Sequence, residues 1–486
     1  NKSREFFYLC FLRVYGRRWI ILAIVALLNN SNTMSWIAFA SIANHVDEFY
    51  RMNKAANWFS MVYLLCTIPV GIFAMWLGSR FGLQMTIQIA AWANAIGGLI
   101  RLSSSFAPVH YRFPVGIFGQ AVAACAYPFI MFLPPKVAGT WFAENERTIA
   151  TTIGIMSNPL GVLLANLISP QIVTNSSHVP IINIITFVPT FFACLLAVIF
   201  INRSQPKMPP SFSAAQNQMC FLPGLKSVIT NKSYILLLVA IGGGMGMFNC
   251  LYTVMQQLLC ASGYSNSFSG FCAALMIIGG VMGASLTGII VDRTKLFEEI
   301  LKIGMALAVI CGLLFLQLTL HPGLSIALSI VSFVFGVFGL AIYPVALELA
   351  SECTFPVSET TSTGLIVLSG QVQSIIFVAL MQMTGQALQE EYMHIQVCTS
   401  GVDSVAATPQ DSTYSIIVSF TVTVMLIVMF KPIYKRLLVE QGIKATNTTG
   451  IQLKEKIVEK KEGENDAKIV FSNDAKALLT DEIDVA

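Results

Sequence analysis

The sequence predicts an all-α membrane protein with twelve transmembrane helices arranged as two pseudo-symmetric halves of six. The chain of 486 residues is 55% hydrophobic and 11% charged, whereas a typical soluble domain carries about 25% charged residues. Apolar stretches of about 20 residues, which as helices cross a hydrocarbon core of about 30 Å, recur along the chain. A short charged connection also occurs at corresponding places in the two halves, at Gly78–Gly82 and Gly288–Lys295, as in internally duplicated transporters.

The twelve spans are expected to be helices because backbone amides find no water partner in lipid. Their expected starts are Trp19, Trp58, Met85, Tyr111, Thr148, Pro180, Tyr234, Phe271, Ile303, Leu324, Thr363 and Ser415. They divide the chain into an N-terminal segment (1–18), a first half (19–201), a linker (202–232), a second half (233–435) and a tail (436–486).

Lys and Arg residues predict the orientation of the bundle. Most of them fall on the side that holds both termini, the linker and the paired charged connections, whereas the other side holds Arg51, Lys54, Arg101 and Arg112. Because positive residues mark the cytoplasmic face, both termini are expected in the cytoplasm. The sequon at Asn175 then lies outside and is an expected glycosylation site. The plasma membrane is the favoured location, and an endosomal or lysosomal membrane is the alternative.

The linker and the tail have polar compositions. The Pro-rich middle of the linker predicts a flexible tether, with a short interfacial helix near Phe221–Ile229. From about Glu440 onward the chain is rich in charged and small polar residues, so the tail is expected to be disordered. An acidic dileucine string that ends at Leu478 and Leu479 suggests a sorting adaptor as a partner, although such strings also arise by chance.

The expected spans hold little that could perform chemistry. Arg101, Lys136 and Glu348 are expected toward helix ends, and no carboxylate is expected at mid-depth. Because a proton relay requires intramembrane Asp, Glu or His, the sequence favours facilitated diffusion. No His/Cys cluster has metal-ligand spacing and no Ser/His/Asp constellation is present, so we expect no metal, no cofactor and no enzymatic activity.

Neutral polar and aromatic residues recur at the same helical spacing, i, i+3 and i+7, in the first and seventh expected helices. Matching polar faces are expected when two repeat-related helices line one central cavity. The expected substrate-binding residues are Asn29, Asn32, Trp36, Gln120, Tyr127, Asn249, Tyr252, Gln256 and Gln371. The alternative for each amide is an interhelical hydrogen bond that only holds the bundle together.

A second group of residues is expected to form a cytoplasmic gate that closes when the two halves rock against each other. Its charged members are expected to make contacts between the halves, and its glycines to permit tight turns and close helix approach. The expected gate residues are Gly78, Arg80, Gly82, Arg147, Gly288, Asp292, Arg293, Glu352 and Glu359.

Several stretches resemble known families. The connection Gly78–Gly82 and its second copy around Asp292 are similar to the signature loop of the major facilitator superfamily, although Ser79 stands where that signature usually has Asp. The likeness to the feline leukaemia virus subgroup C receptor-related family, also called solute carrier family 49, runs from about Arg17 to Lys435. The stretches that carry it are Asn57–Tyr63, Pro344–Pro356 and Thr363–Gln371, with Leu28–Phe39 and Met156–Gly161 resembling one member.

The resemblance implies alternating access and an amine substrate. Choline-transporting members of this family hold the quaternary ammonium with a first-helix Trp, a seventh-helix Tyr and Gln residues on the fifth and eleventh helices. Trp36 and Gln371 match this pattern, whereas Pro159 and Asn249 replace the fifth-helix Gln and the Tyr, and Tyr252 substitutes in part. An aromatic face can bind an ammonium group without a carboxylate, so we expect a uniporter of a choline- or ethanolamine-like cation or another amine.

Three alternatives remain open. Family members have been linked to haem export, and haem iron prefers His, Cys, Met or Tyr. All the histidines fall in or next to outer connections, at His45, His110, His178, His321 and His394. A proton-linked transporter of a vitamin-type solute in an acidic organelle is the second alternative. The third is a receptor or scaffold without transport, against which the polar faces argue.

Overall fold

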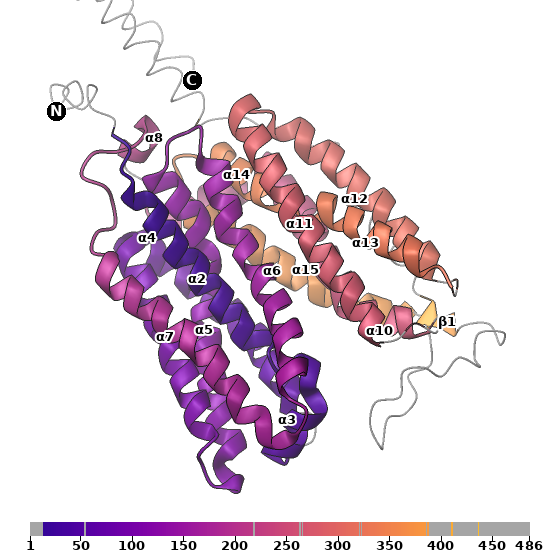
Figure 1. The fold of residues 1–486 in the computed structure, drawn as a ribbon. Coiled ribbons are helices and arrows are strands. Elements are labelled where there is room, and N and C mark those ends of the chain that lie inside the picture. The colour runs from indigo at the N-terminus through magenta and orange to yellow at the C-terminus, as the bar shows by residue number, and fades with distance from the viewer. Residues whose placement is uncertain are drawn as a thin grey trace, which may run out of the picture. The chain divides into compact units, whose positions relative to one another are not determined.

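A computed structural model describes the fold over residues 13–52, 55–216, 219–261, 264, 266–319, 321, 323–384, 386–387, 410–411 and 436. These residues belong to one compact unit, Cys10–Leu437. Apart from the two-residue strands β1 (Gln386–Ala387) and β2 (Gln410–Asp411), which pair antiparallel, the regular elements of the described ranges are helices (Figure 1). The predicted all-α class is therefore confirmed.

The first half contains five long helices and three short elements. The long helices are α2 (Arg17–Ile37), α4 (Ala55–Ser104), α5 (Val109–Trp141), α6 (Arg147–Ile172) and α7 (Val179–Phe200), and the short elements are η2 (Ala40–Ile42), α3 (Ala43–Tyr50) and η3 (Ser176–His178). Helix α4 carries the second and third expected spans. Gly82 separates them with a φ of 80° and a ψ of 179°, a backbone conformation that glycine adopts without a steric cost.

The linker contains two short helices, α8 (Phe212–Ala215) and α9 (Phe221–Thr230). Helix α9 lies where the short interfacial helix was expected. The rest of the linker is more than a tether, because it bonds to both halves. The amide of Gln84 in α4 donates to Ser204 Oγ at 3.1 Å, and the amide of Met219 donates to the carbonyl of Pro356 at 3.1 Å.

The second half contains the remaining helices. They are α10 (Lys232–Ala261), α11 (Asn266–Thr294), α12 (Phe297–Thr319), α13 (Ser325–Gly339), α14 (Ile342–Thr354) and α15 (Glu359–Thr384). The tenth expected span comprises α13 and α14, which are separated by a turn at Leu340 and Ala341 and together form one candidate membrane span, Ser325–Thr354. Pro344 lacks the amide that would bond the carbonyl of Leu340, and it lies in the first turn of α14, where proline is tolerated.

Nine helices of the described ranges are long and apolar enough to cross a membrane. Eleven of the twelve expected starts lie in or at the ends of described helices, and the twelfth, Ser415, lies outside the described residues. The helices expose large apolar side chains outward, such as Ile72, Phe118 and Ile326 at 54%, 62% and 79%. Such side chains would be unfavourable in water and are suited to lipid.

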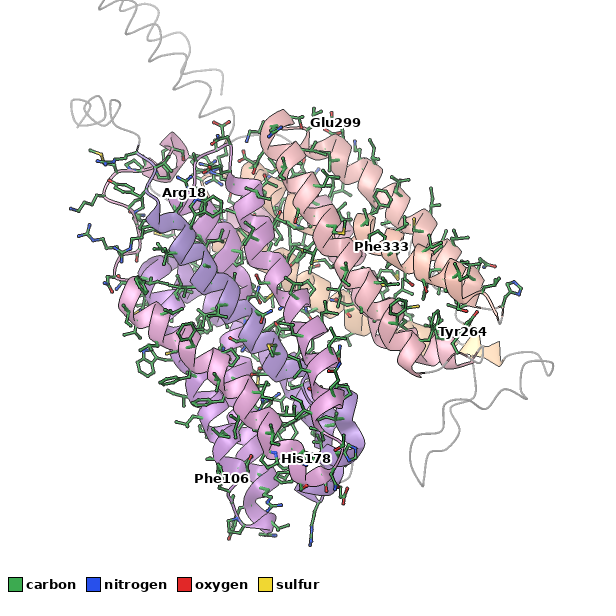
Figure 2. The ribbon with its side chains drawn as sticks, in the orientation of Figure 1. Arg18, Phe106, His178, Tyr264, Glu299 and Phe333 are labelled. Carbon is green, nitrogen blue, oxygen red and sulfur yellow. The ribbon has the colours of Figure 1, made fainter. Side chains whose placement is uncertain are left out.

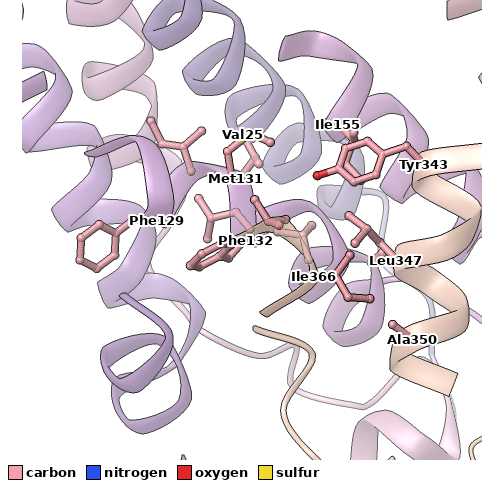
Figure 3. Packing of buried hydrophobic residues seen from close by; sticks show 14 of the residues in the cluster. Val25, Phe129, Met131, Phe132, Ile155, Tyr343, Leu347, Ala350 and Ile366 are labelled. Atoms are coloured by element: carbon pink, nitrogen blue, oxygen red, sulfur yellow. The ribbon is translucent and has the colours of Figure 1, made fainter. Parts of the chain in front are cut away.

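The two halves share one hydrophobic cluster. It includes Phe132 and Ile155 of the first half and Tyr343, Leu347 and Ile366 of the second half (Figure 3). Helix α6 packs against α11 and α14, and α5 packs against α15 (Figure 1). We call the end of the bundle that carries the linker the linker end. Arg18 lies at this end of the first half, and Phe106 and His178 lie at the opposite end (Figure 2).

Candidate functional site

Three aromatic rings meet inside the first half. The Trp36 ring of α2 stacks on the Tyr63 ring of α4, with centroids 5.8 Å apart and planes 24° apart. Tyr127 of α5 lies 5.9 Å from Trp36 and 6.0 Å from Tyr63, centroid to centroid. Trp36 is half-buried, whereas Tyr63 and Tyr127 are 1% and 6% exposed. We call Trp36, Tyr63 and Tyr127 the aromatic cluster, and Trp36 is its accessible member.

Hydrogen bonds fix the aromatic cluster to the backbone. Trp36 Nε1 donates to the carbonyl of Ser60 at 3.2 Å, and the Tyr63 hydroxyl donates to the carbonyl of Asn32 at 3.3 Å. Tyr63 was not among the expected substrate-binding residues. The signal that could have found it is the stretch Asn57–Tyr63, which carried the family resemblance.

Asn29 and Asn32 are fully buried among helices of the first half. Asn29 Nδ2 donates to the carbonyl of Gly154 at 2.9 Å, and its Oδ1 accepts from Asn158 at 3.1 Å. Asn32 Nδ2 donates to Asn94 Oδ1 at 2.9 Å and to the carbonyl of Ala123 at 3.0 Å. These contacts favour the bundle-packing interpretation of both amides.

Gln120 is also fully buried, and it connects α5 to two other helices. Its Nε2 donates to the carbonyls of Ser35 and Phe59, at 3.2 Å each. These residues immediately precede Trp36 and Ser60, which are joined by the indole hydrogen bond. Gln120 therefore holds together the two backbone segments that carry Trp36 and its acceptor.

Arg101, near the end of α4, holds Gln120 in turn. Its Nη1 donates to Gln120 Oε1 at 2.8 Å and to the carbonyl of Ser35 at 2.6 Å, and its Nη2 donates to Thr186 Oγ1. The guanidinium lies 5.0 Å from the ring of Phe39. Arg101 is 2% exposed, and the hydrogen-bond partners it has among the described residues are neutral. The sequence placed Arg101 toward a helix end but gave it no role.

The second half contributes residues that the structure describes in part. Asn249 of α10 is half-buried, and Gln371 of α15 is buried. The side chains of Tyr252 and Gln256 lie outside the described residues.

A charged cluster joins the halves at the linker end. Asp292 of α11 is 5% exposed, and its Oδ1 and Oδ2 accept hydrogen bonds from the amides of Thr148 and Ile149 at 2.9 Å and 2.8 Å. An acid of the second half therefore caps the start of α6 in the first half, where the helix dipole favours negative charge.

Buried ion pairs surround this cap. Arg147 Nη1 lies 3.9 Å from Glu352 Oε1. Arg436 Nη1 lies 3.8 Å from Glu348 Oε1, and Arg436 Nη2 lies 3.3 Å from Glu359 Oε1. All five side chains are nearly inaccessible. Glu348 and Arg436 were not among the expected gate residues.

Lys136 and the glycines complete the linker end. Lys136 Nζ donates to the carbonyl of Gly78, which connects α5 to α4 within the first half. A Cβ on Gly78 would lie 3.0 Å from Thr360 Cγ2, and one on Gly288 would lie 3.0 Å from Thr152 Oγ1. Both glycines therefore lie where a helix of the other half approaches closely.

Two expected gate residues lie away from these contacts. Arg293 is exposed. Arg80 is exposed too, and its guanidinium lies 5.9 Å from the ring centroids of Trp76 and Phe81 in its own half. Ser79 donates to the carbonyl of Trp76 at 2.9 Å, so it makes a local contact at the position where the signature loop usually has an acid.

Asn175 is exposed beside η3, at the end opposite the linker. His45, His110, His178 and His321 lie at helix ends or in connections, and His394 lies outside the described residues. The described ranges contain no group of three or more His, Cys, Asp or Glu side chains that could hold a metal ion. The tail with Leu478 and Leu479 also lies outside the described residues.

The Major Facilitator Superfamily matches residues 15–384, and the chain belongs to this superfamily of membrane transporters. The proton:xylose symporter XylE has a TM-score of 0.64 at 15% identity over 86% of this chain and 96% of that one. The fucose transporter FucP in the outward conformation has a TM-score of 0.64 at 10% identity over 86% of this chain and 100% of that one. These similarities confirm the predicted fold of two six-helix halves.

Relatives define the branch of the superfamily. Uncharacterized protein B0416.5 of Caenorhabditis elegans is 59% identical over 90% of this chain and 87% of its own length. Solute carrier family 49 member A3 of Xenopus tropicalis is 40% identical over 77% and 79%. The choline/ethanolamine transporter flvcr2a of Danio rerio is 31% identical over 75% and 80%. The chain is therefore an integral membrane transporter related to solute carrier family 49.

Proposed function

We propose that this protein is a uniporter that moves a choline- or ethanolamine-like cation, or another small amine, by alternating access. The observation that carries the proposal is the aromatic cluster, in which the half-buried Trp36 is held by Tyr63, Tyr127 and a backbone hydrogen bond. A rigid aromatic face binds an ammonium group with about 0.5–2 kcal/mol in the absence of a carboxylate. The family relationship to a choline/ethanolamine transporter supports the same class of solute.

In this proposal, the residues around Trp36 take specific roles, whereas Asn29 and Asn32 hold helices of the first half together. Trp36 contacts the cation, and Tyr127 and Tyr63 fix the orientation of its ring. Gln120 and Arg101 act as positioning residues, because their contacts go to the backbone beside Trp36. Asn249 and Gln371 contribute from the second half, together with Tyr252 and Gln256.

The linker end supplies the gate. We assign it to the cytoplasm because most Lys and Arg residues gather there, which places Asn175 outside and available for glycosylation. The ion pairs of Arg147 with Glu352 and of Arg436 with Glu348 and Glu359, together with the Asp292 cap, then close the cytoplasmic end. Rocking of the halves must break these contacts to open a path inward. The plasma membrane is the proposed location.

An uptake panel tests the proposal. Cells that express the chain are given labelled choline, ethanolamine, a vitamin-type amine and haem, at neutral and acidic outer pH, beside Trp36→Ala and Trp36→Phe variants at matched surface amounts. We expect uptake of one small amine that does not depend on the proton gradient, that is lost in Trp36→Ala and is partly kept in Trp36→Phe. Transport of haem alone, or uptake that requires a proton gradient, would contradict the proposal.

A further inference from the structure

Two linker serines lie inside the charged cluster at the linker end. Ser211 and Ser213 flank the start of the short helix α8, and they are only 3% and 5% exposed. Arg147 Nη2 donates to Ser211 Oγ at 2.5 Å and to Ser213 Oγ at 2.7 Å. Arg436 Nε donates to the same Ser213 Oγ at 3.1 Å. One hydroxyl thus accepts hydrogen bonds from an arginine of α6 and from Arg436, which follows the last expected span of the second half.

We propose that the segment Ser211–Ser213 is an internal ligand of the gate. In this proposal, the arginines of the gate bind a neutral hydroxyl at position 213, and the gate excludes an anionic side chain there. The proposal goes beyond the solute and concerns the linker alone. In the described structure, Ser213 Oγ bridges Arg147 and Arg436, and each of these arginines also pairs with a carboxylate of the second half. The bridge can form only while the two halves are together at this end.

The charge balance of the cluster explains why the ligand is a hydroxyl. Lys136, Arg147 and Arg436 supply three positive charges, and Glu348, Glu352 and Glu359 supply three negative ones. The carboxylate of Asp292, a fourth acid at this end, accepts hydrogen bonds from the backbone amides at the start of α6. The described cations of the cluster already contact carboxylates or, for Lys136, the carbonyl of Gly78. Among the described residues, no further cation would balance an additional buried negative charge on the linker, which is strongly unfavourable.

The close packing around Arg436 also favours a neutral ligand. A Cβ on Gly139 of α5 would lie 2.5 Å from Glu359 Oε1 and 3.0 Å from Arg436 Nη2. Arg436 Nη2 also donates to the carbonyl of Gly139 at 3.4 Å. Arg436 and Glu359 therefore pack closely against the backbone of α5, which leaves Arg436 little freedom to rearrange around an acidic side chain at position 213.

The test measures the gate in the absence of any solute, so it is independent of the proposed substrate. Spin labels are introduced at the exposed positions 80 and 293, one in each half, through an unnatural amino acid because the chain has native cysteines. Double electron–electron resonance on the full-length protein in lipid nanodiscs then reports the closed and open populations. The variants are Ser213→Ala, Ser213→Thr and Ser213→Asp. Ser204→Ala is the control, because among the described residues the Ser204 hydroxyl bonds to α4 of the first half and not to either arginine.

We expect Ser213→Ala to lower the closed-to-open ratio at least about tenfold, because Ser213 Oγ accepts hydrogen bonds from two arginines and the loss of even one bond to a charged group costs about 1.5–3 kcal/mol. Ser213→Asp should lower it further, whereas Ser213→Thr and Ser204→Ala should keep the wild-type distribution. The proposal is overturned if Ser213→Ala and Ser213→Asp both superimpose on the wild type, or if Ser213→Asp favours the closed population. A shift of the same size in Ser204→Ala would also overturn it, because the effect would then not depend on the arginine bridge.

Discussion

Asp292 of α11 accepts a hydrogen bond from the backbone amide of Thr148, so that an acid in one half caps a helix of the other half. The neighbouring Ile149 amide occupies the second carboxylate oxygen. The corresponding connection of the first half has Ser79, which bonds locally instead. The two charged connections are therefore not equivalent. Asp292 of the second-half connection caps a helix of the other half, whereas Ser79 of the first-half connection bonds to its own helix.

The cap predicts the effect of removing its charge. Asp292→Asn keeps one acceptor but loses the favourable interaction with the α6 dipole, which together with the cap contributes about 1 kcal/mol. We expect the closed-to-open ratio, measured with labels at positions 80 and 293, to fall about fivefold. Glu299→Gln, at an exposed acid of α12, is the control. Equal distributions for Asp292→Asn and the wild type would rule out a gating role for the cap.

Close helix approach predicts a steric effect at Gly288. A Cβ at this position lies 3.0 Å from Thr152 Oγ1, so Gly288→Ala requires a small shift and Gly288→Leu forces α11 away from α6. Overpacking costs about 1–3 kcal/mol, and we expect the leucine variant to lose most of the closed population. The alanine variant should stay near the wild type. If Gly288→Leu closes normally, the helices do not approach as described.

We expect Arg101 to affect the affinity for the solute although it does not contact the solute. Arg101→Lys keeps the charge but replaces two nitrogen atoms, Nη1 toward Ser35 and Gln120 and Nη2 toward Thr186, with one ammonium nitrogen, so part of these contacts is lost. Because hydrogen bonds to charged groups contribute about 1.5–3 kcal/mol, we expect KM for uptake to rise about tenfold while the maximal rate per surface molecule is kept. Arg112→Lys, at the end opposite the linker, is the control. A loss of surface amount with unchanged KM would show a purely structural role.

Two variants of Tyr63 separate the contribution of its ring from that of its hydroxyl. Tyr63→Phe loses a hydrogen bond of 3.3 Å to the carbonyl of Asn32 but keeps the stack on Trp36, so KM should change less than about threefold. Tyr63→Leu loses the aromatic pair, which contributes about 0.5–1.5 kcal/mol, and should raise KM more. Equal KM values for the two variants would exclude the ring from the site.

The sequence predicted the spans and the face of α2 that carries Trp36, because apolar length and helical spacing are local properties. Spacing does not tell which neighbour a face meets. α2 packs against α4, α5, α6 and α7, so Asn29 and Asn32 point into interhelical contacts although they share a face with Trp36. The pairing of Ser213 with Arg436 joins residues 223 positions apart, and the sequence gives no periodic signal for such a contact.

The central claim is that Trp36 binds the positive charge of the solute. It is tested most directly by competition between labelled choline uptake and two unlabelled compounds, choline and its uncharged isostere 3,3-dimethylbutan-1-ol. We predict that choline competes about 2- to 30-fold better than the isostere, the range set by a cation–π contribution of about 0.5–2 kcal/mol, and that this ratio is smaller in Trp36→Phe, which keeps part of the uptake and has a weaker cation-binding ring. Equal competition by the two compounds in the wild type would contradict the account.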